Sequence, residues 1–246
     1  SIKLVAYYHD FDINSKDIPE CDHIEFRNLN DLEELHQFRN TYKDFNGTGK
    51  DSQGYNWRMD GIKFSHKVFA IADCAFNLKS DSDEAEGDHD PGWLVWMDAD
   101  TVTEKNLSKK ALLKSLPEKV NLVHLGRKHF TYSETSFIGF NLNSDTALEF
   151  IGDFIGAYLT GDVFNYREET DELFNRYSHN PSHIKSIWKK YGRTDCRDYI
   201  PASFYNLMYH DLYLLHPFLR VKKLKSLSVI DKKNTLHFKT KFDKVK

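Results

Sequence analysis

Cysteine is scarce in this sequence, with only Cys21, Cys74 and Cys196 among 246 residues. An odd number of widely spaced cysteines predicts reduced thiols in a cytoplasmic protein rather than a disulfide framework. The closely spaced cysteine pairs of a structural zinc site are missing as well. We therefore expect a hydrophobic core, and neither disulfides nor structural zinc, to hold the fold together.

Long apolar runs are also missing, because no stretch approaches the roughly 20 residues that a membrane-spanning helix needs. Residues 1–4 do not have the layout of a signal peptide. No internal repeat or low-complexity tract occurs. We therefore expect a single globular unit over residues 1–246, without a membrane span.

Neither sign of charge dominates, since 34 Lys and Arg stand against 37 Asp and Glu for a net charge of −3. This near balance argues against general polyanion binding as the main activity. The charges are unevenly distributed, however: between Arg220 and Lys246 only Asp231 and Asp243 are acidic. The end of the chain is therefore a basic segment.

A continuous apolar run, WLVWM at residues 93–97, predicts a strand buried on both faces of a mixed or parallel sheet. It is followed by Asp98 and Asp100, at the carboxyl edge where open α/β sheets bind ligands. Two acids separated only by Ala99 repel each other unless a cation lies between or beside them. A hard divalent ion that also binds phosphate oxygens meets this requirement. The sequence thus predicts an α/β fold with a metal site at Asp98 and Asp100.

A buried strand that ends in Asp-x-Asp resembles the metal and nucleotide-sugar motif of glycosyltransferases with the GT-A fold. The resemblance implies a central mixed, mostly parallel sheet flanked by helices. It implies a metal-dependent transfer of a sugar from a nucleotide diphosphate-sugar, with a UDP-sugar expected first, to an acceptor hydroxyl. It also implies one domain with a nucleotide-sugar half at about 1–125, an acceptor-side half at about 126–219 and a closing segment at 220–246. The simpler alternative is that the two acids only cap a core strand.

The first strand is predicted at residues 2–8, where IKLVAYY is followed by His9 and Asp10. It should end at the same sheet edge as Asp98. In the GT-A fold this end commonly lies beside the nucleotide base, so the resemblance makes Tyr7, Tyr8 and His9 candidate donor contacts. Ordinary core and surface packing is the alternative for the two tyrosines.

A helix is predicted from Trp57 to Leu78, because apolar residues recur there at steps of three and four. It carries Arg58 and Lys63, which resemble the basic residues that meet the donor's nucleotide or diphosphate in this fold. A solvated surface charge is the alternative for an exposed lysine. The glycine-rich segment 46–56 and the acidic segment 80–90 are predicted to be loops.

The segment after Asp-x-Asp should contain further strands and helices. Gly139 lies inside a predicted strand at residues 137–141, which suggests a close approach of a ligand or another backbone. The resemblance makes Glu134, Thr135 and Asn141 acceptor-side residues, although a turn explains the first two equally well. The other predicted elements are a helix at 31–42 capped by Asn30, a helix at 107–116, a strand at 120–125 and a helix from 144 or 145 to 158 whose inner face is Leu148, Ile151, Ile155 and Leu159.

Two downstream segments complete the candidate site. Asp171, with Glu172 as second choice, opens a predicted helix at a position that resembles the place where inverting GT-A enzymes hold their general base. Acids at a helix start are also plain helix stabilisers. His237 is followed by Lys239 and Lys241, which resembles the C-terminal His and Lys that close the metal site in several GT-A families, although Thr240 replaces the expected glycine.

The expected cofactor is Mn²⁺ or Mg²⁺, bound by Asp98, Asp100 and His237, with Asp98 also close to the donor. The acceptor is expected to be a glycan or a modified DNA base. Small enzymes of this layout also occur in bacteriophages, some of which glycosylate modified bases of their own DNA. The basic C-terminal segment is compatible with such an acceptor.

Two other functions are compatible with the same residues. Haloacid-dehalogenase-like phosphatases also have Asp-x-Asp-x-Thr/Val after an apolar strand, with Asp98 then the nucleophile and Asp100 the acid/base. That motif normally lies near the start of its domain, and no paired-acid motif follows it here. A non-catalytic module that binds a nucleotide-sugar or a carbohydrate is the other alternative.

Overall fold

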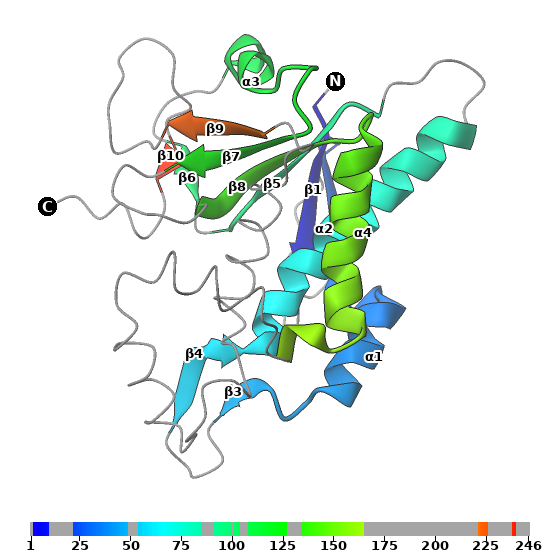
Figure 1. Ribbon diagram of the computed structural model, residues 1–246, viewed down its shortest axis with the longest axis vertical. Coiled ribbons are helices and arrows are strands. Elements are labelled where there is room, and N and C mark those ends of the chain that lie inside the picture. Colours follow the sequence, from blue (N-terminus) through cyan, green and yellow to red (C-terminus); the bar gives the residue numbers. More distant parts are fainter. Residues whose placement is uncertain are drawn as a thin grey trace, which may run out of the picture. The chain divides into compact units, whose positions relative to one another are not determined.

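The computed structural model describes residues 2–9, 22–48, 54–84, 91–99, 101–103, 108–126, 134–164, 221–225 and 238–239, and Figure 1 shows their helices and strands. These residues form two compact units. Unit 1 contains those within 1–77 and 151–166, and unit 2 contains those within 78–150 and 204–246. Helices and strands occur in both, so the protein is a mixed α/β chain, as predicted.

Unit 1 contains two small sheets. Strand β1 (Leu4–Tyr8) pairs in parallel with β2 (Ile24–Asn28), with Leu4 opposite Ile24 and Tyr8 opposite Asn28. Strand β3 (Asn46–Thr48) pairs antiparallel with β4 (Tyr55–Asp60). The first strand is therefore confirmed, whereas the predicted loop at 46–56 contains β3 and the beginning of β4.

The helices of unit 1 begin later than predicted. A short 3-10 helix, η1 (Leu29–Asp31), precedes α1 (Glu33–Thr41), and it is Asn28 rather than Asn30 whose side chain caps this turn. Helix α2 (Gly61–Glu84) begins after Asp60, whose carboxylate accepts the Lys63 N–H at 2.7 Å as an N-cap. Residues 57–60 thus belong to β4, and the predicted acidic loop is helical as far as Glu84.

Aromatic side chains fill the core of unit 1. Phe38 of α1 lies with its ring centroid 5.7 Å from that of Phe69 and 5.4 Å from that of Tyr158. Phe164 of η2 (Asp162–Phe164) stacks on Phe45 at 4.0 Å, and a Cβ at Gly61 would lie 2.5 Å from the Phe164 ring. Such pairs of aromatic rings stabilise a fold by more than the burial of their apolar area alone would.

Helix α4 (Asp145–Leu159) is confirmed, but of the four residues predicted on its inner face only Ile151 is buried. Leu159 is 45% exposed, and Leu148 and Ile155 are only half-buried. The buried residues are Ala147, Phe150, Ile151, Phe154, Ala157 and Tyr158. The aromatic residues of α4, rather than its leucines, therefore decide which side faces the interior.

Unit 2 contains a four-stranded sheet in the order β5–β8–β7–β9. Its strands are β5 (Trp93–Met97), β7 (Leu122–Gly126), β8 (Glu134–Asn141) and β9 (Val221–Lys225). Strand β8 is antiparallel to both neighbours, and β7 is parallel to β9.

Strand β5 differs from its prediction. It lies at one end of this sheet among the described strands, its residues 93–96 are half-buried, and Met97 is 39% exposed. It was predicted to be buried on both faces and to share a sheet with the first strand. In the part of the chain that the structure describes, β1 and β5 belong to separate sheets.

The two faces of the unit 2 sheet have different helical neighbours. On one face, Leu112 of α3 (Lys109–Ser115) packs against a core that includes Leu116, Val123 and Leu224. On the other face, the ring centroid of Phe140 on β8 lies 5.8 Å from that of Phe150 in the first turns of α4. The sheet is thus a middle layer between α3 and the beginning of α4 (Figure 1).

Gly139 lies in a tightly packed part of this core. A Cβ there would lie 2.6 Å from Val123 Cγ2 and 3.1 Å from Leu116 Cδ2. The tight packing predicted at this glycine is present, but side chains rather than a ligand or a backbone cause it. None of the helices in the described ranges combines the length and apolar character needed to cross a membrane.

Candidate functional site

The Asp-x-Asp segment forms a tight turn at the end of β5. The Asp98 N–H donates to the carbonyl of Ser136 on β8 at 2.9 Å, which extends the sheet by one residue. The Thr101 N–H then donates to the Asp98 carbonyl at 2.9 Å and closes a four-residue turn. Asp100 lies outside the described residues.

The carboxylate of Asp98 is oriented by a neighbouring indole. Trp96 Nε1 donates to Asp98 Oδ1 at 2.6 Å, and residues two apart on a strand lie on the same face. A carboxylate has about four acceptor positions. The indole occupies one of these positions and restricts the orientation of the side chain.

Strand pairing joins this turn to the end of the chain. Strand β6 (Val102–Thr103) pairs antiparallel with β10 (Phe238–Lys239), with Thr103 opposite Phe238 and Val102 opposite Lys239. Strand β6 begins two residues after Asp100, and β10 begins directly after His237. Residues 102–103 and 238–239 therefore lie side by side in unit 2. Because the pairing is antiparallel, Val102, which is nearer to Asp100 in the sequence, lies opposite Lys239, and Thr103 lies opposite Phe238, which follows His237.

Only part of the predicted metal site can be compared with the structure. Asp98 is described, whereas Asp100, His237 and Lys241 lie outside the described residues. Lys239 is described as part of β10, without its side chain. Within the described ranges, no group of three or more His, Cys, Asp or Glu side chains could hold a metal ion.

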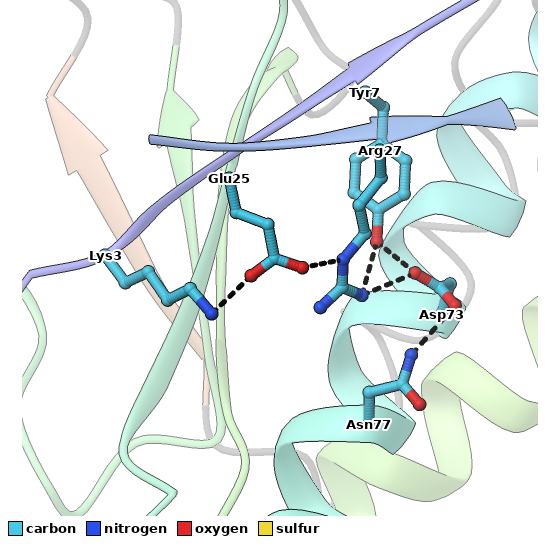
Figure 2. Close-up of polar contacts among 6 residues, drawn as sticks. All are labelled: Lys3, Tyr7, Glu25, Arg27, Asp73 and Asn77. Carbon is cyan, nitrogen blue, oxygen red and sulfur yellow. Dashed lines mark hydrogen bonds and ion pairs between the residues drawn. The ribbon is translucent and has the colours of Figure 1, made fainter. Parts of the chain in front are cut away.

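A second polar cluster, which sequence reasoning missed, lies in unit 1 (Figure 2). The Tyr7 hydroxyl donates to the Asp73 carboxylate of α2 and accepts from Arg27 Nη1 at 3.3 Å. Arg27 of β2 donates from Nη1 to Asp73 at 2.7 Å and from Nε to Glu25 at 2.5 Å. Lys3 forms an ion pair with Glu25, and Asn77 donates to Asp73 at 2.9 Å. We call these six residues the Arg27 cluster.

The Arg27 cluster ties the parallel sheet to α2. Burial, followed by the hydrogen bond to Asp73, raises the pKa of Tyr7, so its hydroxyl stays protonated. The hydrogen bonds from Lys3 and Arg27 lower the pKa of Glu25, so it stays ionised. One sequence signal could have revealed the cluster: Asp73 is the only acid between Gly61 and Ser80, inside an otherwise apolar run.

Two predicted donor-binding residues of unit 1 lie around one imidazole. The rings of His9 and His66 are 4.3 Å apart, and Arg39 Nη2 lies 2.9 Å from His66 Nε2. Burial, then the charges of Arg39, His9 and Lys63, lowers the pKa of His66 to about 3. His66 is therefore neutral at physiological pH and accepts from Arg39. The predicted residues His9 and Lys63 thus belong to one basic group beside the carboxyl end of β1.

The remaining donor-side predictions have mixed outcomes. Tyr7 has its hydroxyl engaged by the Arg27 cluster, and Tyr8 is half-buried at the end of β1. Arg58 lies on β4 rather than on the predicted helix, and its side chain is outside the described residues. The nucleotide contacts of Tyr7, Tyr8, His9, Arg58 and Lys63 stay predictions.

On the acceptor side, the contacts of Asn141 are internal. Its buried side chain donates to the carbonyls of Glu118 at 3.1 Å and Val120 at 3.2 Å, and accepts the Asn143 N–H at 3.2 Å. These bonds explain Asn141 as a tie between the end of β8 and the segment before β7, without an acceptor.

The other acceptor-side and catalytic predictions are not tested by the structure. Glu134 and Thr135 begin β8 rather than a turn, with side chains outside the described part. Asp171 and Glu172 lie outside the described residues.

Comparison of the chain with protein-family models, with curated proteins and with solved structures finds no match.

Proposed function

We propose that the protein is a metal-dependent glycosyltransferase of the GT-A type, which moves a sugar from a nucleotide diphosphate-sugar to an acceptor hydroxyl. The observation that carries the proposal is the pairing of β6 with β10. It sets residues 102–103, which follow Asp-x-Asp, beside residues 238–239, which follow His237, and so supports a metal and diphosphate site to which both segments contribute. The orientation of Asp98 by Trp96 is a second supporting observation.

The donor set fits the expected ion. Two carboxylates, Asp98 and Asp100, and the His237 imidazole are suitable ligands for Mn²⁺, and carboxylates also suit Mg²⁺. When bound, such an ion stabilises the negative charge on the departing nucleotide diphosphate. Lys239 and Lys241 supply further positive charge to the same phosphates.

In the proposed reaction, a residue outside the metal site accepts the proton of the acceptor hydroxyl. Asp171, with Glu172 as second choice, would accept the proton of the acceptor hydroxyl if the reaction inverts the anomeric centre.

The proposal is tested with purified protein, a panel of nucleotide-sugars and Mn²⁺. We expect one UDP-sugar to raise the melting temperature only when Mn²⁺ is present, because a ligand that binds the native state stabilises it. We also expect slow Mn²⁺-dependent release of UDP. Asp100→Asn and His237→Ala should each reduce that release by about 100-fold or more, whereas Asp81→Asn, at an exposed position of α2, should not.

Other outcomes would contradict the proposal. Mg²⁺-dependent hydrolysis of nitrophenyl phosphate that disappears in Asp98→Asn would support the phosphatase alternative. Donor binding without any release of UDP would support a binding module. Full activity of both Asp100→Asn and His237→Ala would remove the proposed metal site.

A further inference from the structure

Unit 2 gathers lysines from two segments that are about one hundred residues apart in the sequence. Residues 108–126 and 221–225 together contain seven lysines and one acid, Glu118. The other 222 residues contain 27 basic and 36 acidic residues. These two segments are therefore strongly basic within a chain whose net charge is −3.

The fold brings these two segments to the same face of the sheet. Strand β9 pairs in parallel with β7, with Lys222 opposite Val123 and Leu224 opposite Leu125. Val123, Leu125 and Leu224 belong to the core against which Leu112 of α3 packs. Because residues two apart on a strand share a face, Lys222 lies on the side of the sheet that α3 covers.

The lysines on this side are accessible. Lys109, Lys110 and Lys114 of α3 and Lys119 of the following turn are exposed, and Lys222 is half-buried. We call these five residues the lysine surface. The acids at the start of α4, Asp145 and Glu149, belong to the helix that packs through Phe150 on the opposite face of the sheet. The sheet therefore separates the lysine surface from these acids.

We propose that the lysine surface binds the phosphate backbone of a nucleic-acid duplex, and that this duplex carries the acceptor hydroxyl. Duplex DNA presents one negative charge about every 1.7 Å along its axis, and each lysine that contacts a phosphate releases counterions. Lysine contacts of this kind position a protein on the duplex without reading its sequence. A surface made of lysines is therefore suited to hold a duplex, while the choice of acceptor base belongs to the transfer site.

The side chains on this surface favour a duplex over a membrane. A helix that lies on a lipid surface inserts a stripe of apolar side chains, often Trp, Phe and Leu. Helix α3 has seven residues, and Leu113 is its only large exposed apolar side chain. Binding would thus depend on charge alone, and it should be strongest for the polyanion with the highest charge density.

The role of the duplex as acceptor rests on the proposed glycosyl transfer, whereas the binding of the duplex does not. The experiment separates the two. Fluorescence anisotropy of a labelled short DNA duplex measures binding, and Mn²⁺-dependent UDP release without DNA measures the transferase site. Transfer of radiolabelled sugar to a duplex that carries hydroxymethylated bases then measures the combined reaction.

We expect the logarithm of the binding constant to fall with the logarithm of salt concentration with a slope of about −4 between about 50 and 200 mM salt. Lys110→Gln should reduce the size of this slope by about 1. Lys110→Gln combined with Lys114→Gln should weaken binding by at least about tenfold. Glutamine keeps the helix propensity of α3. Lys43→Gln, at an exposed position of unit 1, is the matched control and should leave binding unchanged.

Three results would overturn the lysine surface as a duplex site. The duplex could fail to bind, it could bind equally well to the Lys110 and Lys114 variants, or anionic phosphatidylserine vesicles could bind in its place. Circular dichroism melting curves of each variant confirm that weaker binding is not loss of fold. Duplex binding without UDP release would refute the proposed transferase activity but support the lysine surface as a duplex site. UDP release without duplex binding would support the transferase activity and refute the duplex site.

Discussion

Units 1 and 2 use their charged residues in opposite ways. In unit 1, Arg27 lies between Glu25 and Asp73, and the charges of the Arg27 cluster satisfy one another. In unit 2, the lysine surface gathers charges of one sign, and Asp98 ends a strand in a turn. The comparison teaches that the charges of the Arg27 cluster are compensated inside unit 1, whereas those of the lysine surface share one sign on the outside of unit 2.

The largest effect is expected from a substitution of Asp73 in unit 1. Asp73→Ala deletes the acceptor of three side chains, Tyr7, Arg27 and Asn77. The side chains of Arg27 and Asp73 are only 24% and 20% exposed, so the loss is close to that of a buried pair. We expect the free energy of unfolding to fall by about 3 kcal/mol, measured by urea denaturation.

The control for this change is on the same helix. Asp81→Ala, at an exposed position of α2, should alter stability by less than about 0.5 kcal/mol. Hydrogen exchange should show the loss caused by Asp73→Ala in β1 and β2. Equal loosening of both strands by the two variants would mean that the Arg27 cluster is not a structural tie.

A second test examines whether side-chain packing, rather than charge pairing, stabilises the fold of unit 2. Gly139→Ala would place a methyl group 2.6 Å from Val123 Cγ2 in its core. We expect a loss of about 2 kcal/mol from overpacking, measured by the shift of the urea midpoint. Adding Val123→Ala should recover part of that loss, because the two positions are coupled. Strictly additive effects of the two changes would contradict the packing described here.

The smallest effect concerns His66 and the pH dependence of unit 1. Its pKa is lowered to about 3 by burial and by the neighbouring Arg39, His9 and Lys63, while the unfolded chain titrates near 6.5. The unfolded state therefore binds more protons between these values, and stability falls as the pH drops below about 6.5. His66→Gln should remove up to about 2 kcal/mol of the stability difference between about pH 7.5 and about pH 5.

Urea denaturation at several pH values checks this prediction. The exposed His36 of α1 is the control position, and His36→Gln should behave as the unchanged chain does. A pH dependence that His66→Gln does not alter would show that His66 is protonated normally in the folded state.

Local patterns predicted many of the elements but not all of their limits. The apolar run at 93–97 and the amphipathic segment at 145–158 correspond to β5 and α4. The start of α2 was predicted too early because Trp57 matches the helical spacing, although Asp60 before Gly61 is an N-cap signal. The buried side of α4 was misjudged because leucines and aromatic residues both recur at helical steps.

Long-range contacts could not be predicted in the same way. The Arg27 cluster joins residues separated by 20 and 46 positions, and no periodicity connects Tyr7, Arg27 and Asp73. The order of Asp-x-Asp and His237 along the chain suggested a shared site, but only the register of β6 and β10 gives their neighbouring segments a common position. Tertiary pairing of this kind depends on the whole fold rather than on local preference.

The parallel pairing of β7 with β9 and the antiparallel pairing of β6 with β10 have a consequence for synthesis. A ribosome delivers β5, β7 and β8 long before residues 221–239 leave its exit tunnel. Until then the edge of β7 that β9 will occupy stays open, and open strand edges invite pairing with other chains. A nascent chain stalled before residue 221 would therefore present an aggregation-prone edge and an Asp-x-Asp turn that still lacks its partner strand.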